Sequence, residues 1–120
     1  MEGIYIDINC DVGEGIGNEA ELLPFISSCN IACGAHAGDH GTMRRVIQLA
    51  KKFDVKVGAH PSYPDRENFG RFTMEIEPGV LAKSLRAQIN RLENILADER
   101  VSLHHIKPHG ALYNDLVKNG

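Results

Sequence analysis

Side chains suited to hydrolytic chemistry recur at four places along the chain, each where an apolar stretch ends. They are Asp11, His36 or His40, His60, and the pair Lys107 and His109. One carboxylate with two or three imidazoles is a typical ligand set for a divalent metal, for which Zn²⁺ is the default. The same residues without a metal supply a general base and an electrophile, and a lysine can neutralise a substrate carboxylate or an oxyanion. The residue types leave both alternatives open.

The segment from Asn30 to His40 shows how the chain would position such residues. It begins as a short apolar run and ends in glycines, two histidines and an aspartate, after which apolar residues recur at helical spacing from Thr42 onward. A strand, a polar turn and a helix make half of a βαβ unit, and α/β folds place their chemistry at such carboxyl ends of strands. The simplest alternative is a structural loop in which Asp39 or Thr42 caps the helix.

The remaining elements follow the same alternation. We expect strands at 4–9, 29–33, 55–59 and 101–107, and helices at 20–23, 42–53, 78–100 and from 111 onward. Asn18 and Glu21 resemble a capping box, and the long connection 61–77 is of the kind that usually has a function. This order predicts a parallel sheet, either a small open one or part of a (β/α) barrel. A closed barrel takes about 250 residues, so this single domain would make about half of one.

Strand periodicity predicts which side chains face a common polar cavity. The expected inward residues are Asp7, Asn9 and Asp11, then Asn30 and Ala32 (the less certain pair), then Lys56, Gly58 and His60, and finally His105, Lys107 and His109, with Ile106 outward. Because the carboxyl ends of parallel strands meet at one edge, we expect these polar groups to converge there.

Composition excludes several classes of function. Apolar residues make up 42% of the chain and charged residues 24%, with a net charge of −3, which favours a globular protein without a basic surface for nucleic acid. We find no apolar run of the ~20 residues that a membrane span needs and no signal-peptide pattern. Three cysteines without C-x-x-C spacing are typical of reduced, mostly buried thiols in a cytoplasmic protein.

Five motifs in order carry a family resemblance. They are Asn9–Glu14 (NCDVGE), Asn30–Asp39 (NIACGAHAGD), Gly58–Asp65 (GAHPSYPD), Phe69–Arg71 (FGR) and Lys107–Asn114 (KPHGALYN). Together they resemble the LamB/YcsF family, the A subunit of prokaryotic 5-oxoprolinase. The resemblance implies a seven-stranded TIM-like barrel of the glycoside hydrolase/deacetylase type, of which this chain would be the N-terminal half. The loop after Glu14 is shorter than is usual in the family.

The resemblance also implies ATP-dependent hydrolytic opening of 5-oxo-L-proline to L-glutamate, with partner subunits B and C. We find no G-x-x-x-x-G-K-[ST] pattern, so the partners are expected to contribute to the ATP chemistry. The predicted catalytic residues are Asp11, His60, Lys107 and His109. The predicted substrate-binding residues are Asn9, Asn30, His36, Asp39, Arg71 and Tyr113.

Roles for these residues are hypotheses. Asp11 or His60 would activate water or bind a metal, Lys107 and His109 would stabilise negative charge, and Arg71 would hold the substrate carboxylate as a bidentate partner. A metal would take Asp11, His60 and His109 as ligands. The resemblance supplies no clear metal requirement, which favours the alternative without a metal.

Two other functions remain open at this stage. One is a metal-dependent deacetylase acting on an N-acetyl sugar, and the other is a non-catalytic scaffold subunit. Half a barrel would leave two open strand edges, so the chain is also expected to form a homo-oligomer.

Overall fold

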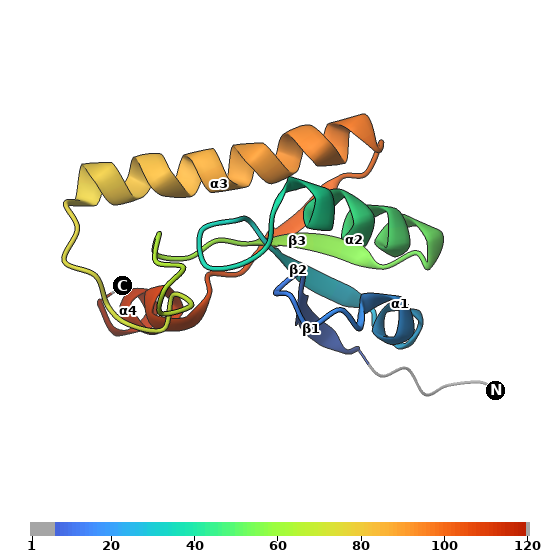
Figure 1. Cartoon of the computed structure of the whole chain (residues 1–120), viewed down its shortest axis with the longest axis horizontal. Coiled ribbons are helices and arrows are strands. Elements are labelled where there is room, and N and C mark those ends of the chain that lie inside the picture. Colours follow the sequence, from blue (N-terminus) through green and yellow to red (C-terminus); the bar gives the residue numbers. More distant parts are fainter. Residues whose placement is uncertain (1–6, 120) are drawn as a thin grey trace.

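The computed structural model describes residues 7–119 and has an alternating α/β architecture (Figure 1). The elements in chain order are β1 (Asn9–Val12), α1 (Glu19–Leu22), the 3₁₀-helix η1 (Leu23–Phe25), β2 (Ser28–Ala32), α2 (His40–Lys52), β3 (Lys56–His60), α3 (Pro78–Asp98), β4 (Leu103–Ile106) and α4 (Gly110–Asn119). The strands form one parallel sheet, so the predicted fold class is confirmed.

The strands lie in the sheet in the same order as in the chain, β1-β2-β3-β4. This order is typical of a (β/α) barrel, whereas a doubly wound sheet reverses direction at a switch point. Helices α2 and α3 lie side by side along the sheet (Figure 1). Within the described residues the sheet does not close, and β1 and β4 are its edges.

One face of the sheet forms the hydrophobic core. Cys29 and Ile31 of β2 and Val57 and Ala59 of β3 are buried against helices α2 and α3. The alternate residues of the same strands point to the opposite face, where Asp11 lies in register with Asn30. This alternation confirms which residues of β1, β2 and β3 were predicted to point to the polar side and which to the helices. The sheet therefore separates a helix-covered apolar face from a polar face.

A bulge in β4 lets the apolar Leu103 face the core while His105 faces the polar side of the sheet. Val57 pairs with Leu103, but the next residue, Gly58, pairs with His105, so one residue of β4 is skipped. A bulge of this kind is needed because Leu103 packs against the core while His105, two residues later, points to the polar face. Ile106 points outward as expected but is exposed at the sheet edge.

Two local predictions are wrong. The first strand is predicted at 4–9, but β1 runs to Val12 and, of the predicted residues that the structure describes, only Asn9 belongs to it; residues 4–6 lie outside the described residues. Asn18 precedes α1, but its side chain makes no capping hydrogen bond. Its backbone oxygen accepts from two amides of this single turn instead, so the capping box does not form.

Helix α2 begins two residues before the predicted Thr42 and has a regular cap. The Asp39 carboxylate accepts a hydrogen bond from the Thr42 amide at 2.8 Å, which satisfies one of the free donors at the helix start. The capping alternative for Asp39 is therefore confirmed.

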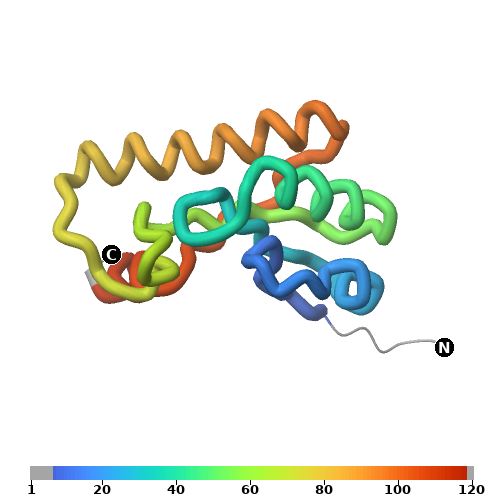
Figure 2. Tube along the Cα trace, viewed as in Figure 1, coloured from blue at the N-terminus to red at the C-terminus, as the bar shows by residue number. Residues whose placement is uncertain are grey.

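The connection between β3 and α3 lies against α4, as the chain trace shows (Figure 2). Tyr63 from this connection donates a hydrogen bond to Asp115 of α4 and packs with Leu112 in a second apolar cluster. The two segments lie close together at Gly70 and Gly110, where a Cβ on Gly110 would lie 2.6 Å from the Gly70 carbonyl oxygen. Gly110 also has φ +57°. A glycine suits this position because it adopts this backbone angle without strain and has no Cβ to clash with Gly70.

The three cysteines are free, and Cys29 and Cys33 are buried, as predicted. Among the described residues, we find no helix with both the length and the apolar character needed to cross a membrane.

Candidate active site

The polar face of the sheet is organised around Asn30, whose side chain is buried. Its Nδ2 donates to Asn9 Oδ1 at 2.6 Å and to Asp11 Oδ1 at 2.9 Å. Its Oδ1 accepts from Asn9 Nδ2 at 3.2 Å and from His105 Nε2 at 2.6 Å. A buried amide with both donors and its acceptor satisfied holds one orientation. Asn30 therefore fixes the position of the Asp11 carboxylate.

Asp11 connects this network to Lys107 and His60. Lys107 Nζ donates to Asp11 Oδ1 at 3.1 Å, and Asp11 Oδ2 lies 3.4 Å from His60 Nε2. A proton held at His60 Nε2, and then the Asn30 amide and Lys107, hold the pKa of Asp11 well below its usual range. The carboxylate is therefore ionised at neutral pH, where it can orient a cation or a water molecule.

A depression of about 450 Å³ opens beside this pair at the carboxyl edge of the sheet. Its lining residues are Asp11, His60, Lys107, Pro108, His109, Gly110, Tyr113 and Asn114. The depression thus brings together residues from β1, β3, the turn between β4 and α4, and α4 itself. A pocket with a few convergent polar groups is the usual place for substrate.

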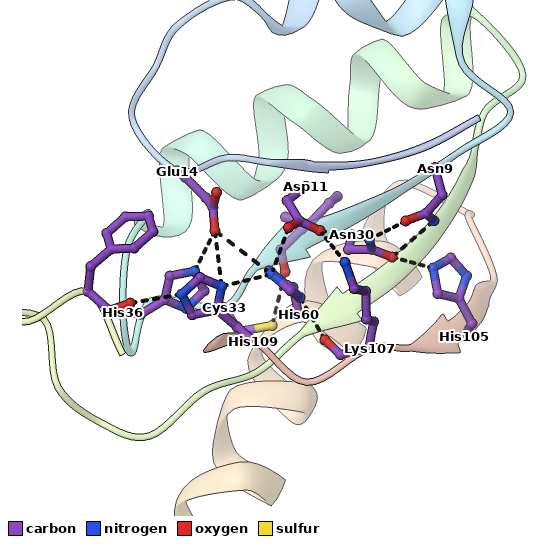
Figure 3. Close-up of polar contacts among 12 residues, drawn as sticks. Asn9, Asp11, Glu14, Asn30, Cys33, His36, His60, His105, Lys107 and His109 are labelled. Atoms are coloured by element: carbon purple, nitrogen blue, oxygen red, sulfur yellow. Dashed lines mark hydrogen bonds and ion pairs between the residues drawn. The ribbon is translucent and has the colours of Figure 1, made fainter. Parts of the chain in front are cut away.

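Three buried histidines and Glu14 gather at one side of this depression (Figure 3). Glu14 Oε2 lies 2.8 Å from His36 Nε2, 3.9 Å from His60 Nε2 and 3.6 Å from His109 Nδ1. His60 Nε2 and His109 Nδ1 are 3.0 Å apart. One ligand atom from each residue lies within 4.8 Å of the others, so these four residues could hold a metal ion. We call them the Glu–His cluster.

The rings of the Glu–His cluster are fixed by stacking and by backbone carbonyls. His36 and His109 stack with centroids 3.8 Å apart and planes 6° from parallel. His60 Nδ1 bonds to the Lys107 carbonyl at 2.6 Å, and His109 Nε2 bonds to the Phe69 carbonyl at 2.8 Å. Burial, and then the neighbouring His36, lower the pKa of His109.

Phe69 covers the cluster from the long connection. Its ring makes edge contacts with His36 and His109 at centroid distances of 5.1 and 5.2 Å. Phe69 has φ +55°, a left-handed conformation that is unfavourable for a bulky residue. Its carbonyl and ring both contact His109, so the surrounding contacts hold this strained residue in place.

Close packing of two loops places Glu14 beside the histidines. A Cβ on Gly38 would lie 2.8 Å from the Gly13 carbonyl oxygen, so the loops after β1 and β2 touch through their backbones. Gly13 and Gly38 have φ +72° and +83°, which a glycine adopts without strain. These turns bring Glu14 and His36 together.

Residues 6–120 match the LamB/YcsF family. The chain belongs to this family. It is also similar to the crystal structure of the lactam utilization protein from Thermus thermophilus, with 41% identity and a TM-score of 0.88. The match covers 93% of this chain and 47% of that protein, so the chain spans about half the length of this relative. The family resemblance inferred from the five motifs is confirmed.

Most of the predicted LamB/YcsF site residues come together. Asp11, His60, Lys107 and His109 share the depression, and Tyr113 also lines it. Asn9 and Asn30 lie in the adjoining polar network, and His36 lies in the Glu–His cluster.

Two predicted substrate-binding residues have other contacts. Asp39 caps α2. Arg71 is exposed, with its guanidinium carbon 5.0 Å from the centroid of the Phe69 ring. Of the two histidines considered after β2, His36 belongs to the cluster and His40 is exposed at the start of α2.

Glu14 is the site residue that sequence reasoning missed. It follows β1 by two residues, so it carries the signal that singled out the other candidates, a polar side chain just past a strand end. The predicted metal ligands Asp11, His60 and His109 differ from the observed cluster, in which Glu14 and His36 join the two predicted histidines. Asp11 is instead paired with Lys107 and Asn30.

Proposed function

We propose that this chain is a component of a 5-oxoprolinase, which opens the ring of 5-oxo-L-proline to give L-glutamate. In this proposal it works with ATP as cosubstrate and with partner subunits B and C. Family membership and the 41% identity to a lactam utilization protein support a lactam as the substrate class. The observation that carries the proposal is the depression in which Asp11, Lys107 and His109 meet.

The chemical problem is the stability of the lactam amide. Transfer of the γ-phosphoryl group of ATP to the lactam oxygen would make the ring carbon more electrophilic. Addition of water then breaks the C–N bond, the ring nitrogen takes up a proton, and the acyl phosphate that remains is hydrolysed by a further water. The products are L-glutamate, ADP and phosphate. Negative charge develops on oxygen at each addition, so positioned cations and donors accelerate it.

The geometry supports a division of roles. Lys107 Nζ, which donates to Asp11 at 3.1 Å, would stabilise negative charge on the substrate oxygen. His109 also faces the depression, and the proposal assigns it the same task. Because its Nε2 donates to the Phe69 carbonyl, His109 would do this through a proton or a metal ion held at Nδ1. The ionised Asp11 would orient water, with His60 beside it as the alternative base. Arg71 stays a predicted partner of the substrate carboxylate.

A glutamate-release assay tests the proposal. The protein containing this chain is incubated with 5-oxo-L-proline and ATP, with and without subunits B and C. We expect glutamate, ADP and phosphate in equal amounts only when the partners and ATP are present. Release of none of these products in the complete mixture would contradict the proposal.

One observation favours a second candidate function. The Glu–His cluster is suited to a metal-dependent hydrolase, which keeps the deacetylase alternative open. Acetate release from an N-acetylated sugar without ATP would support that alternative. A non-catalytic scaffold would instead leave the activity of the complex unchanged in the variants Asp11→Asn and His109→Gln.

A further inference from the structure

We propose that Glu14, His36, His60 and His109 bind one divalent transition-metal ion, with Zn²⁺ as the default for this ligand set. This inference concerns the Glu–His cluster and does not depend on the proposed substrate. Backbone carbonyls fix the protons of two imidazole rings in positions that leave a place for a cation.

His60 and His109 face each other with two lone pairs. A carbonyl oxygen only accepts, so the bond from His60 Nδ1 to the Lys107 carbonyl places a proton on Nδ1, and the bond from His109 Nε2 to the Phe69 carbonyl places one on Nε2. In neutral rings the remaining nitrogens, His60 Nε2 and His109 Nδ1, then carry no proton. They nevertheless lie 3.0 Å apart. A cation between or beside them, either a proton or a metal ion, is needed to stabilise this arrangement.

The other groups near these nitrogens are acceptors as well. Asp11 Oδ2 and Glu14 Oε2 lie 3.4 and 3.9 Å from His60 Nε2, and Glu14 Oε2 lies 3.6 Å from His109 Nδ1. Two carboxylates therefore add negative potential at the point where the two lone pairs meet. Such a site attracts a cation more strongly than a pair of imidazoles would by themselves.

The two facing nitrogens lie in a buried environment. The side chain of His60 is 1% exposed and that of His109 is 10% exposed. Neutral imidazole is the form that binds a metal. The carbonyls that fix His60 and His109 are also the usual outer partners of metal-binding histidines.

The distances suit a tetrahedral ion. Zn²⁺ at its usual ligand distances requires ligand atoms about 3.3 Å apart. Four separations within the cluster are 2.8, 3.0, 3.6 and 3.9 Å, and every ligand atom lies within 4.8 Å of the others, so a bound ion would draw the most distant ligands closer. His36 completes the set with Nε2, which donates to Glu14 Oε2 at 2.8 Å while no metal is bound. Metal binding at Nε2 would move this proton to the buried Nδ1, which has no hydrogen-bond partner among the described residues.

Metal binding gives the decisive test. The chain is purified without a histidine tag, treated with a chelator, and titrated with Co²⁺ and with Zn²⁺. We expect one ion per chain, visible as the strong d–d absorption of tetrahedral Co²⁺, and displacement of Co²⁺ by Zn²⁺. Glu14→Gln and His109→Gln should each weaken Co²⁺ affinity by about 10²-fold or more, since each loses a ligand. His40→Gln, an exposed histidine outside the cluster, is the matched control and should bind like the wild type.

A thermal readout keeps the test independent of catalysis. Zn²⁺ in excess should raise the unfolding temperature of the wild type and of His40→Gln, and should leave Glu14→Gln little changed. Should His109→Gln fail to fold, Glu14→Gln on the loop after β1 answers the same question. The inference is overturned if the wild type binds Co²⁺ no more tightly than Glu14→Gln. It is also overturned if ¹⁵N spectra of the chelator-treated protein show a proton shared by His60 and His109 that Zn²⁺ does not displace.

Discussion

Asp11 gains its properties from neighbours that lie far from it in the chain. Asn30 fixes its carboxylate, Lys107 pairs with one oxygen, and His60 lies near the other. An aspartate at the end of a strand is often only a turn former, but three polar contacts and a lowered pKa are typical of a working site. At the scale of the residue, the site depends on the ion pair between Asp11 and Lys107.

Breaking the pair should reduce activity more than stability. Asp11→Asn and Lys107→Met should each lower glutamate release by the complex by about 10²-fold or more, since each removes a positioned charge. Both side chains are partly exposed, at 34% and 41%, so the unfolding temperature should change little. Steady-state rates and circular dichroism melting curves measure the two effects. A loss below threefold in both variants would remove this pair from the chemistry.

Cys29 should show the opposite behaviour. It is fully buried in the core, and burial raises the pKa of its thiol to about 12, so it stays protonated and unreactive. Cys29→Ser should lower the free energy of unfolding by about 1–3 kcal/mol, because a hydroxyl replaces an apolar group in a dry environment. The rate per folded molecule should stay within twofold. Cys10→Ser, at a half-buried position, is the control, and urea unfolding is the measurement.

At the scale of the element, the connection between β3 and α3 and the helix α4 stabilise each other. Tyr63 donates to Asp115, and Thr73 donates to the same carboxylate. The backbone amides of His109 and Ala111 bond to Pro61 and Gly70 of the connection. Because His109 lies at the start of α4, the docking of this helix controls the geometry of the Glu–His cluster.

The Tyr63 contact predicts a dependence on alkaline pH. The hydrogen bond to Asp115, with burial second, raises the pKa of Tyr63 to about 12 in the folded protein, above the ~10 of an unfolded tyrosine. The folded state thus holds this proton more tightly, so the stabilisation is complete below pH ~10 and is lost as the pH rises towards the folded value. Tyr63→Phe should cost about 1 kcal/mol near pH 8.

The measurement is the difference in unfolding temperature between wild type and Tyr63→Phe at several pH values. This difference should shrink as the pH rises from about 10 to about 12. Tyr113→Phe, at a tyrosine that is 46% exposed, serves as the control and should show no such trend. A difference that stays constant over this interval would show that the Tyr63 hydroxyl does not stabilise the fold.

At the scale of the whole molecule, the sheet has two edges among the described residues. Strands β1 and β4 each pair with one neighbour, so both present backbone donors and acceptors on the other side. Ile106 on β4 is 51% exposed, and Leu116 and Val117 of α4 are also exposed. An unpaired strand edge and exposed apolar side chains both favour association.

A sample of the 120-residue chain should therefore form a dimer or a larger species. Size-exclusion chromatography with light scattering gives the mass directly. A monomer of 13.2 kDa at high concentration would contradict this prediction. Ile106→Lys should shift the equilibrium towards the monomer if β4 is the edge that pairs, because a charged edge residue opposes strand pairing.

The sequence by itself determined the order of the elements, the type of sheet and most of the polar face. Strand periodicity and helical spacing are local properties, so they predicted that Asp11, His60, Lys107 and His109 face one cavity. The five motifs identified the family for the same reason, because they are readable without knowing any contact. These inferences hold wherever a strand keeps its alternation.

Only the tertiary structure decided the membership of the Glu–His cluster. Glu14 joins it because two glycine turns let separate loops pack backbone to backbone, and such an approach depends on segments that are distant in the chain. The bulge in β4 likewise arises from pairing with β3, and the imidazole tautomers are set by carbonyls of Lys107 and Phe69. Loop packing, bulges and proton positions are results of contacts between elements, and no local pattern encodes them.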